Sequence, residues 1–377
     1  MLVMKDKKAL VLKLRDSAQV LNAVPTAKSF TVNGTSLVAV PHRTEETRLL
    51  RNLGYKAPAP IRTYYDWPGR FTPFHAQKEA AAFLSMHKRA FNLSELGTGK
   101  SLASLWAYDY LKSIGLLNKC LIISPLSTLE RTWADELFNH FPHLTFAVLH
   151  GSKDKRIKLL KEDFDVYIVN HDGVGILEPH LKTRTDIDLV IVDEIAQCAR
   201  NAGTTRWKQI NLVVNRHKEP RSCWGMSGTP TPNAPTDAWA QCRLINPASV
   251  PPYFNRFKGT VMKQLSQFQW IARPEATQIV KDVMQPSVRF TRDECLDLPP
   301  LMYETRAVTL TPEQNKAYKE MLTRLSIQAD EGEITAVNEA VKMAKLVQIA
   351  CGVVYATDGT EVTIPTSPRV EETRAII

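Results

Sequence analysis

The feature that most constrains the fold is the string SELGTGKS at residues 94–101, which is followed by a helical pattern from Leu102 to Leu111. Glycines allow backbone N–H groups to turn toward phosphate oxygens, and the N-terminus of the following helix adds a partial positive charge. The lysine of such a loop reaches the β and γ phosphates, and the next serine supplies a ligand for Mg²⁺. The alternative is an ordinary glycine-rich turn, because Ser94 stands where the usual pattern has its first glycine. The residues predicted to bind ATP are Gly97, Thr98, Gly99, Lys100 and Ser101.

A second motif is the apolar run Val190–Val192, which ends in Asp193 and Glu194. Alone, acids at a strand end are commonly a helix cap or a solvated turn. Their order after the phosphate loop favours catalysis, with Asp193 as a ligand of Mg²⁺ and Glu194 as the group that polarises the water attacking the γ-phosphate. We therefore predict Lys100, Asp193 and Glu194 as catalytic residues, and Ser101 and Asp193 as metal ligands.

A third motif follows the apolar run at residues 222–226 and consists of Ser227, Gly228, Thr229 and Pro230. Small hydroxyl side chains at a strand end can hydrogen-bond both the acidic pair and a neighbouring segment. Such a loop could report whether the γ-phosphate is present. Without the other motifs it would be an ordinary proline-rich turn.

Short apolar runs alternate with amphipathic helical stretches from about residue 71 onward. This alternation predicts an α/β fold with a mainly parallel sheet that helices cover on both faces. The predicted strands are residues 120–123, 146–149, 166–169, 189–192 and 222–226.

The first 70 residues differ from the rest, because they hold 12 lysines and arginines against 5 acids in a 377-residue chain whose net charge is +9. They predict a small β-rich module with a hairpin turn at Asn33-Gly34 and a helix over 45–53. The proline-rich stretch 57–60 predicts a boundary. The module is either a contact for a polyanion such as DNA or a packing appendage with solvated lysines.

The composition excludes several classes of protein. Hydrophobic residues make up 44% and charged residues 23%, a globular mixture. No apolar run is long enough to cross a membrane, and the first 25 residues lack a signal-peptide core. The 6 cysteines are scattered without a C-x-x-C pair, as in a reducing compartment. We expect a soluble cytoplasmic monomer with no membrane partner.

In this order the motifs resemble those of superfamily-two helicase-like ATPases, and more narrowly the Swi/Snf type of double-stranded DNA translocase in its compact phage or bacterial form. The resemblance covers roughly residues 71–325 and implies a RecA-like lobe, double-stranded DNA as partner, and the cytoplasm of a bacterial or phage-infected cell. The family's entry motif resembles TPFHAQ at residues 72–77, which implies that Gln77 binds adenine. Many relatives follow the two acids with Ala or Gly and then His, whereas Ile195 and Ala196 stand here, so roles transfer to the two acids only.

The resemblance also implies a DNA-contacting surface. One segment is residues 124–129, with Trp133 a helical turn later, and the second is residues 169–172. Trp133, Trp207 and Trp239 could stack on bases, but core packing suits a duplex translocase better. The loop Ser227–Pro230 matches the family's coupling motif. The implied DNA-binding residues are Ser124, Pro125, Leu126, Ser127, Thr128 and Asn170.

These features divide the chain into a basic β-rich accessory module (1–70), a RecA-like ATP-binding lobe (71–245), a helical protrusion or linker (246–300) and the incomplete start of a second motor lobe (301–377). The strings at 290–294 and 298–300 resemble the passage toward the second lobe, and Gln314 and Tyr318 match its opening helix. Relatives carry arginine fingers in that lobe. We therefore expect turnover to require a second motor lobe, in cis or in trans.

Two functions are open at this point. The first is an ATP-dependent, DNA-stimulated helicase-like translocase on double-stranded DNA, of which these residues are the N-terminal half; remodelling, branch migration and unwinding are equally compatible. The second is a non-catalytic, nucleotide-responsive DNA-binding module. A small-molecule kinase with a phosphate loop does not explain Asp193 and Glu194 together with the loop Ser227–Pro230.

Overall fold

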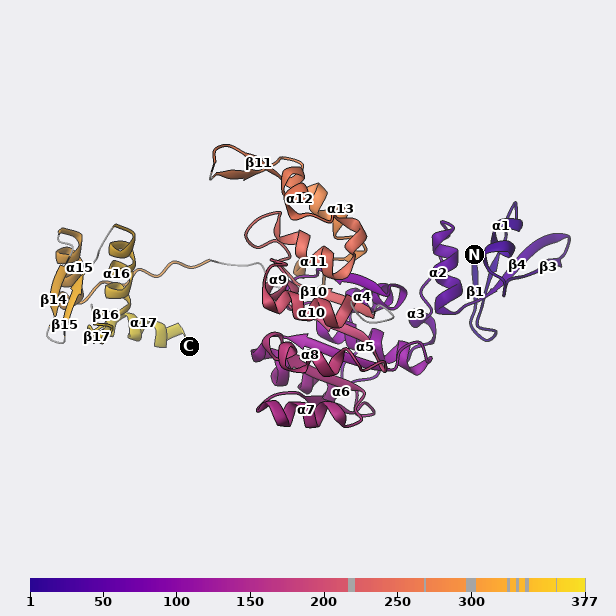
Figure 1. Ribbon diagram of the computed structural model, residues 1–377, viewed down its shortest axis with the longest axis horizontal. Coiled ribbons are helices and arrows are strands. Elements are labelled where there is room, and N and C mark those ends of the chain that lie inside the picture. The colour runs from indigo at the N-terminus through magenta and orange to yellow at the C-terminus, as the bar shows by residue number, and fades with distance from the viewer. Residues whose placement is uncertain are drawn as a thin grey trace. The chain divides into compact units, whose positions relative to one another are not determined.

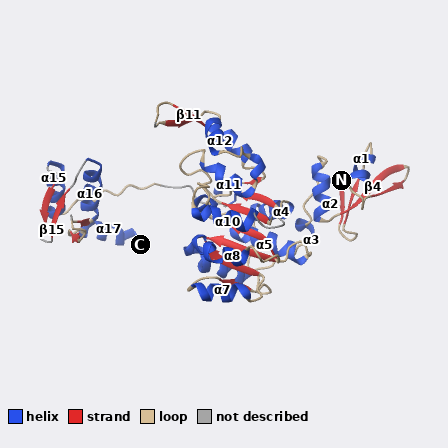
Figure 2. Ribbon diagram, in the orientation of Figure 1, coloured by secondary structure: helices blue, strands red, loops and turns tan. Residues whose placement is uncertain are grey.

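The computed structural model describes residues 1–215, 221–267, 269–295, 303–323, 326–329, 332–335, 339–356 and 358–376 (Figures 1 and 2). The chain forms two compact units, Met1–Leu298 and Pro299–Ile377. Residues 298–300, which the sequence pattern assigns to the passage toward a second lobe, lie outside the described residues.

The first unit begins with an antiparallel sheet in the order β1-β2-β4-β3. Asn33 and Gly34 have φ angles of +47° and +76°, as a two-residue hairpin turn requires. Val20 and Leu50 bring two helices into the core of this sheet. The elements are β1 (Leu2–Met4), β2 (Ala9–Leu12), α1 (Ala18–Ala23), β3 (Lys28–Val32), β4 (Thr35–Pro41) and α2 (Thr44–Asn52).

The main sheet of the first unit contains seven described strands, all parallel, in the order β13-β5-β10-β9-β6-β8-β7. Helices cover both faces (Figure 2), and alternate residues of each inner strand enter two separate hydrophobic cores. The α/β, mainly parallel prediction is therefore confirmed. The strands are β5 (Arg89–Asn92), β6 (Lys119–Ser124), β7 (Phe146–Val148), β8 (Val166–Asn170), β9 (Ile187–Val192), β10 (Ser222–Met226) and β13 (Ser287–Val288).

The two cores separate the helices by face. One core takes Leu84, Leu105 and Leu137 from helices on its side of the sheet. The other takes Leu177 and Leu244 from the opposite side. The helices on the first face are α3 (Ile61–Tyr64), α4 (His75–Met86), α5 (Lys100–Ser113) and α6 (Asp135–His140), and those on the second are α7 (Lys153–Lys161), α8 (Val174–Leu181), α9 (Ile195–Cys198), α10 (Thr205–Asn215) and α11 (Asp237–Ile245).

The basic β-rich sheet is attached to the main sheet through α2. Arg48 donates from Nε to the carbonyl oxygen of Met86 and from Nη2 to that of Ser85, both at 2.9 Å. Ala57 and Ala59 in the proline-rich stretch are buried. The stretch is therefore a packed connection between the two sheets.

Residues 287 and 288 illustrate a difference between pattern and structure. The sequence places them in the protrusion, but they form β13, the edge strand that pairs with β5. Neither β13 nor β5 has the long β-branched run that is typical of the central strands, so the pairing of β13 with β5 arises from tertiary packing. The protrusion itself consists of α12 (Phe254–Val261), β11 (Met262–Gln264), β12 (Trp270–Ala272) and α13 (Ala276–Val283), and the short helix α14 (Arg292–Cys295) follows β13.

The second unit has its own small core, which includes Met321, Leu346 and Val354. Gln314 is buried and donates from Nε2 to the carbonyl oxygen of Ile349 at 2.9 Å, so it holds two helices together. The elements are α15 (Pro312–Thr323), β14 (Ser326–Ala329), β15 (Gly332–Thr335), α16 (Glu339–Cys351), β16 (Val353–Tyr355), β17 (Glu361–Thr363) and α17 (Ser367–Ile376). Among the helices described, none is both long and apolar enough to cross a bilayer.

Candidate nucleotide site and its neighbouring segments

The predicted site residues follow the carboxyl ends of adjacent strands. In the sheet register Ser124 pairs with Asn170, Ile123 with Val192, and Met226 with Asn92. The phosphate loop (residues 94–101), the acidic pair (Asp193 and Glu194) and the loop Ser227–Pro230 therefore start from one edge of the sheet, where ligands of open parallel sheets bind. Tertiary structure brings together motifs that lie far apart in the sequence.

The phosphate loop needs its glycines. Gly97 and Gly99 have φ angles of +83° and +77°, a region that L side chains rarely adopt. A Cβ at Gly99 would also collide with the Gln77 amide nitrogen. Lys100 begins α5 and donates from Nζ to the Glu95 carbonyl oxygen at 2.9 Å. The loop thus has the tight backbone and the helix N-terminus that phosphate binding requires.

Lys100 is the positive centre of the site. Its side chain is buried, and burial lowers the pKa of its ammonium group, an effect opposed by the charges of Glu194, Asp193 and Glu95. Burial likewise raises the pKa of Asp193, and burial together with the Asp193 charge raises the pKa of Glu194. Two acids facing one lysine leave a negative excess that a bound cation would relieve.

The oxygen donors at this edge fit Mg²⁺. Ser101 supplies a hydroxyl beside Lys100, and Asp193 supplies a carboxylate that acts electrostatically on the same lysine. Within the described ranges no group of three or more His, Cys, Asp and Glu side chains could hold a metal. This donor set suits Mg²⁺, which usually combines one or two protein oxygens with substrate phosphates and water.

Glu194 has an unusual backbone. Its φ is +45°, in the left-handed region that is uncommon for a residue with a side chain. Its N–H donates to Asp193 Oδ1 at 3.0 Å. Burial and the Asp193 charge raise the pKa of its side chain, and the Lys100 charge and a hydrogen bond from Ser227 only partly offset that rise. Such strain persists where surrounding contacts impose it, and it is concentrated at functional sites.

The loop Ser227–Pro230 lies against the phosphate loop. Ser227 donates its N–H to the Asn92 carbonyl oxygen at 3.2 Å, and its hydroxyl accepts from the N–H of Thr229 at 3.2 Å. A Cβ at Gly228 would approach the Leu96 backbone nitrogen to 3.3 Å. Ser227 thus connects the strand before the phosphate loop to Glu194.

Gln77 lies beside the phosphate loop. Its side-chain oxygen accepts from the Phe74 N–H at 2.9 Å, which completes the first turn of α4, and its amide nitrogen faces Gly99. Its assignment to adenine stays a prediction.

The two DNA-contacting segments predicted from the resemblance differ in exposure. Ser124 is fully buried, whereas Leu126 is 59% exposed and Ser127 is also exposed. Asn170 is only partly buried, and its side-chain oxygen accepts from Arg156 Nη1 at 3.0 Å. Any side-chain contact made by the first segment must therefore come from Pro125 or from the turn Leu126–Thr128, since the Ser124 side chain does not reach the surface.

Three residues near Asp193 were not assigned to the nucleotide site from the sequence. Trp133 donates its indole N–H to Asp193 Oδ2 at 3.0 Å, and His171 Nε2 lies 2.9 Å from the Asp193 backbone oxygen. Glu136 has a buried Oε2 without a hydrogen-bond partner, and burial, with the Asp193 charge, raises its pKa to about 8. Trp133 is in the core as expected, but its polar contact was not foreseen. The signal available for Trp133 was its position shortly after β6, because β6 pairs with β9, the strand that ends directly before Asp193.

The SNF2-related domain model matches residues 76–351, most of the chain. The chain belongs to the SNF2-related domain family. This SNF2-related chain is 27% identical over 304 residues to protein p41 of Acyrthosiphon pisum secondary endosymbiont phage 1, covering 76% of the chain and 65% of that protein. It is 26% identical over 290 residues to the Drosophila melanogaster homologue of the SWI/SNF-related regulator of chromatin containing DEAD/H box 1, covering 70% and 33%. The chain thus spans less than two thirds of these relatives.

The fold is also that of a solved structure. The Sulfolobus solfataricus SWI2/SNF2 ATPase core in complex with dsDNA matches with a TM-score of 0.50 and 21% identity, over 82% of this chain and 64% of that one. Together with the seven-stranded parallel sheet, this likeness confirms the predicted RecA-like lobe.

Proposed function

We propose that this chain is an ATP-dependent, DNA-stimulated motor on double-stranded DNA. The observation that carries the proposal is the convergence of Lys100, the acidic pair and Ser227 at one edge of the sheet, next to two segments that the family resemblance assigns to DNA. Family membership supports the ATPase class, and the solved SWI2/SNF2 core bound to dsDNA supports the choice of nucleic acid.

Each residue has a separate task in the proposed reaction. Lys100 holds the β and γ phosphates with its ammonium group. Ser101 and Asp193 would hold Mg²⁺, which would supply positive charge against the charge that develops during phosphoryl transfer. Glu194 orients the attacking water. Its hydrogen bond with Ser227 gives the coupling loop a direct response to the state of the γ-phosphate.

DNA is bound through its phosphates in this proposal. The exposed turn Leu126–Thr128 and the Asn170 segment offer backbone and hydroxyl donors, which position a duplex without reading its sequence. The basic β-rich sheet adds positive charge, with Lys5, Lys7 and Lys13 exposed. We expect affinity to be independent of sequence and to fall steeply with salt.

A second motor lobe, in cis or in trans, completes the proposed enzyme. The chain covers 64% of the solved SWI2/SNF2 core, and the proposal assigns the transition-state arginines to the remaining part of such a core. An arginine finger contributes on the order of 10³ to 10⁵ in rate in nucleotide hydrolases.

The test is steady-state ATP hydrolysis with and without duplex DNA, together with calorimetric binding of Mg·ATP. We expect binding in both conditions and faster turnover with DNA. Binding of ATP and DNA without DNA-stimulated turnover, even with a second lobe supplied, would leave the non-catalytic DNA-binding module as the function. Absence of ATP binding would refute the site assignment.

The basic sheet is tested separately by replacing Lys5, Lys7 and Lys13 with Gln. If these lysines contact DNA, the slope of log affinity against log salt should fall by up to about 0.9 per lysine. An unchanged slope would identify the sheet as a packing element attached through Arg48.

A further inference from the structure

Both segments assigned to DNA lead directly to a contact with Asp193. Trp133 follows the turn Leu126–Thr128, and its indole N–H donates to the carboxylate at 3.0 Å. His171 follows Asn170, and its Nε2 lies 2.9 Å from the Asp193 backbone oxygen. Because a carbonyl oxygen can only accept, His171 carries a proton on Nε2. Two different elements thus hold one acid, by its side chain and by its backbone.

These contacts are sealed from solvent. Trp133 is 0% exposed, His171 5% and Asp193 7%. Water cannot replace a broken hydrogen bond in such a place, so leaving the indole N–H and the carboxylate unpaired carries a large free-energy cost. A displacement of Trp133 therefore either moves Asp193 or breaks a bond that has no substitute.

The backbone between the exposed turn and Trp133 is irregular. Leu126–Thr128 form a 3₁₀ turn, and Leu129–Ala134 continue as a π-helical segment before α6 begins at Asp135. Mid-helix π-helical turns are rare and frequently occur at functional sites. Leu126 is exposed, whereas Leu129 is buried. This short segment therefore runs from the surface to the acid.

We infer that Trp133 and His171 are positioning residues that couple duplex DNA binding to the orientation of Asp193. DNA at the turn Leu126–Thr128 and at Asn170 orders the two segments and holds the carboxylate ready for Mg²⁺. The inference rests on the proposed function and adds the physical link between its two ligands. Since coupling is reciprocal, DNA tightens binding of Mg·nucleotide by the same factor as Mg·nucleotide tightens binding of DNA.

The experiment measures the affinity of the full chain for the non-hydrolysable analogue AMP-PNP with Mg²⁺, with and without a saturating short duplex. Trp133→Phe keeps an aromatic ring in the core and removes the N–H. The matched control is Trp106→Phe, because Trp106 is also fully buried in the same core but donates to the Pro68 carbonyl oxygen at 2.8 Å. We expect DNA to tighten binding about 5- to 150-fold in the parent and in the control, and less than about 2-fold in Trp133→Phe.

A readout in EDTA separates positioning from general damage. Without Mg²⁺, DNA should no longer tighten AMP-PNP binding in the parent, because the link runs through a metal ligand. Coupling that persists in EDTA, or equal coupling in Trp133→Phe and in the control, overturns the inference.

Failure of the proposed function looks different: the parent chain would then either bind neither AMP-PNP nor duplex, or hydrolyse ATP without stimulation by DNA even when a second lobe is supplied. A parent that binds both without any coupling overturns only the inference. Should Trp133→Phe fail to fold, as judged by thermal unfolding, His171→Phe removes the second contact and is held to the same criterion.

Discussion

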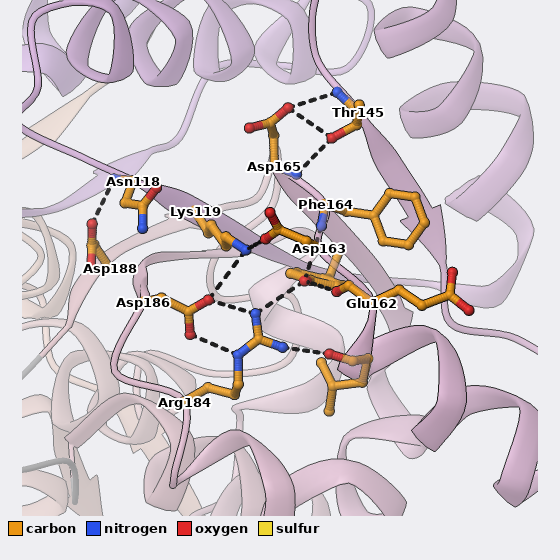
Figure 3. Close-up of polar contacts among 12 residues, drawn as sticks. Asn118, Lys119, Thr145, Glu162, Asp163, Phe164, Asp165, Arg184, Asp186 and Asp188 are labelled. Atoms are coloured by element: carbon orange, nitrogen blue, oxygen red, sulfur yellow. Dashed lines mark hydrogen bonds and ion pairs between the residues drawn. The ribbon is translucent and has the colours of Figure 1, made fainter.

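At the amino end of the seven-stranded sheet the charged side chains around Asp186 are paired with one another, whereas at its carboxyl end Asp193 and Glu194 face a single lysine (Figure 3 shows the amino end). Arg184 donates from Nε and Nη2 to the two oxygens of Asp186, both at 2.6 Å, and Lys119 contacts the same acid at 3.3 Å. The Arg184 hydrogen bonds lower the pKa of Asp186 to about 2, against the effect of burial.

Asp165 strengthens the contrast. Burial opposes its ionisation, but hydrogen bonds from Lys112 and from the N–H and hydroxyl of Thr145 lower its pKa overall. At the carboxyl end burial raises the pKa values of Asp193 and Glu194, and the Lys100 charge and the hydrogen bonds to these acids do not offset that rise. The paired acids Asp165 and Asp186 at the amino end therefore contribute stability, and the carboxyl end holds charge that becomes favourable only when a ligand supplies its counterpart.

The largest effect is expected from Glu194→Gln. The amide keeps the shape of the side chain but cannot act as the carboxylate does, so DNA-stimulated turnover should fall by about 10²- to 10⁴-fold. Affinity for Mg·ATP should change by less than about threefold. Steady-state and binding assays check this, with Asp186→Asn as a control at the amino end whose turnover should match the parent. Undiminished turnover in Glu194→Gln would remove Glu194 from the chemistry.

A pair of lysine variants tests the comparison directly. Lys100→Ala should weaken Mg·ATP binding by about 10- to 100-fold, because the β and γ phosphates lose their main point charge. Lys119→Ala should leave ATP affinity unchanged, since its partners are Asp163 and Asp186 at the far end. Calorimetry measures both. Equal affinities for Lys100→Ala and the parent would contradict the phosphate-loop assignment.

Arg184→Ala should lower the free energy of unfolding by about 1 to 3 kcal/mol, because it breaks the paired contact with Asp186 and the 3.0 Å hydrogen bond to the Tyr167 hydroxyl. Denaturant titration checks the loss, with ATP affinity as the control. A drop in ATP affinity without a loss of stability would contradict the assignment of Arg184 to the stabilising end of the sheet.

The smallest effect concerns pH. The folded-state pKa of Asp186 is below its unfolded value of about 3.9, so its contribution is fully present above that value and is lost as pH falls through about 2. The gap in unfolding free energy between the parent and Asp186→Asn should be about 1 kcal/mol near neutrality, because solvent screens this partly exposed pair. It should shrink on acidification. A gap that grows at low pH would mean that the pair does not hold Asp186 ionised.

The sequence by itself determined the features that depend on neighbouring residues. The phosphate loop needs only a few consecutive residues with the right backbone freedom. The central strands are recognisable in the sequence as apolar runs, because both of their faces are buried. The hairpin at Asn33-Gly34 is equally local, since two left-handed residues define that turn.

Only the tertiary structure decided which of these parts touch. The bond from Trp133 to Asp193, the burial of Ser124 and the edge strand β13 have no local signature, because each depends on a partner distant in the sequence. Arg184 and Asp186 are close in sequence, yet Lys119, which also contacts Asp186, comes from the distant strand β6. Charge patterns in a sequence do not show which acids are paired. That depends on which strand ends the parallel sheet places side by side.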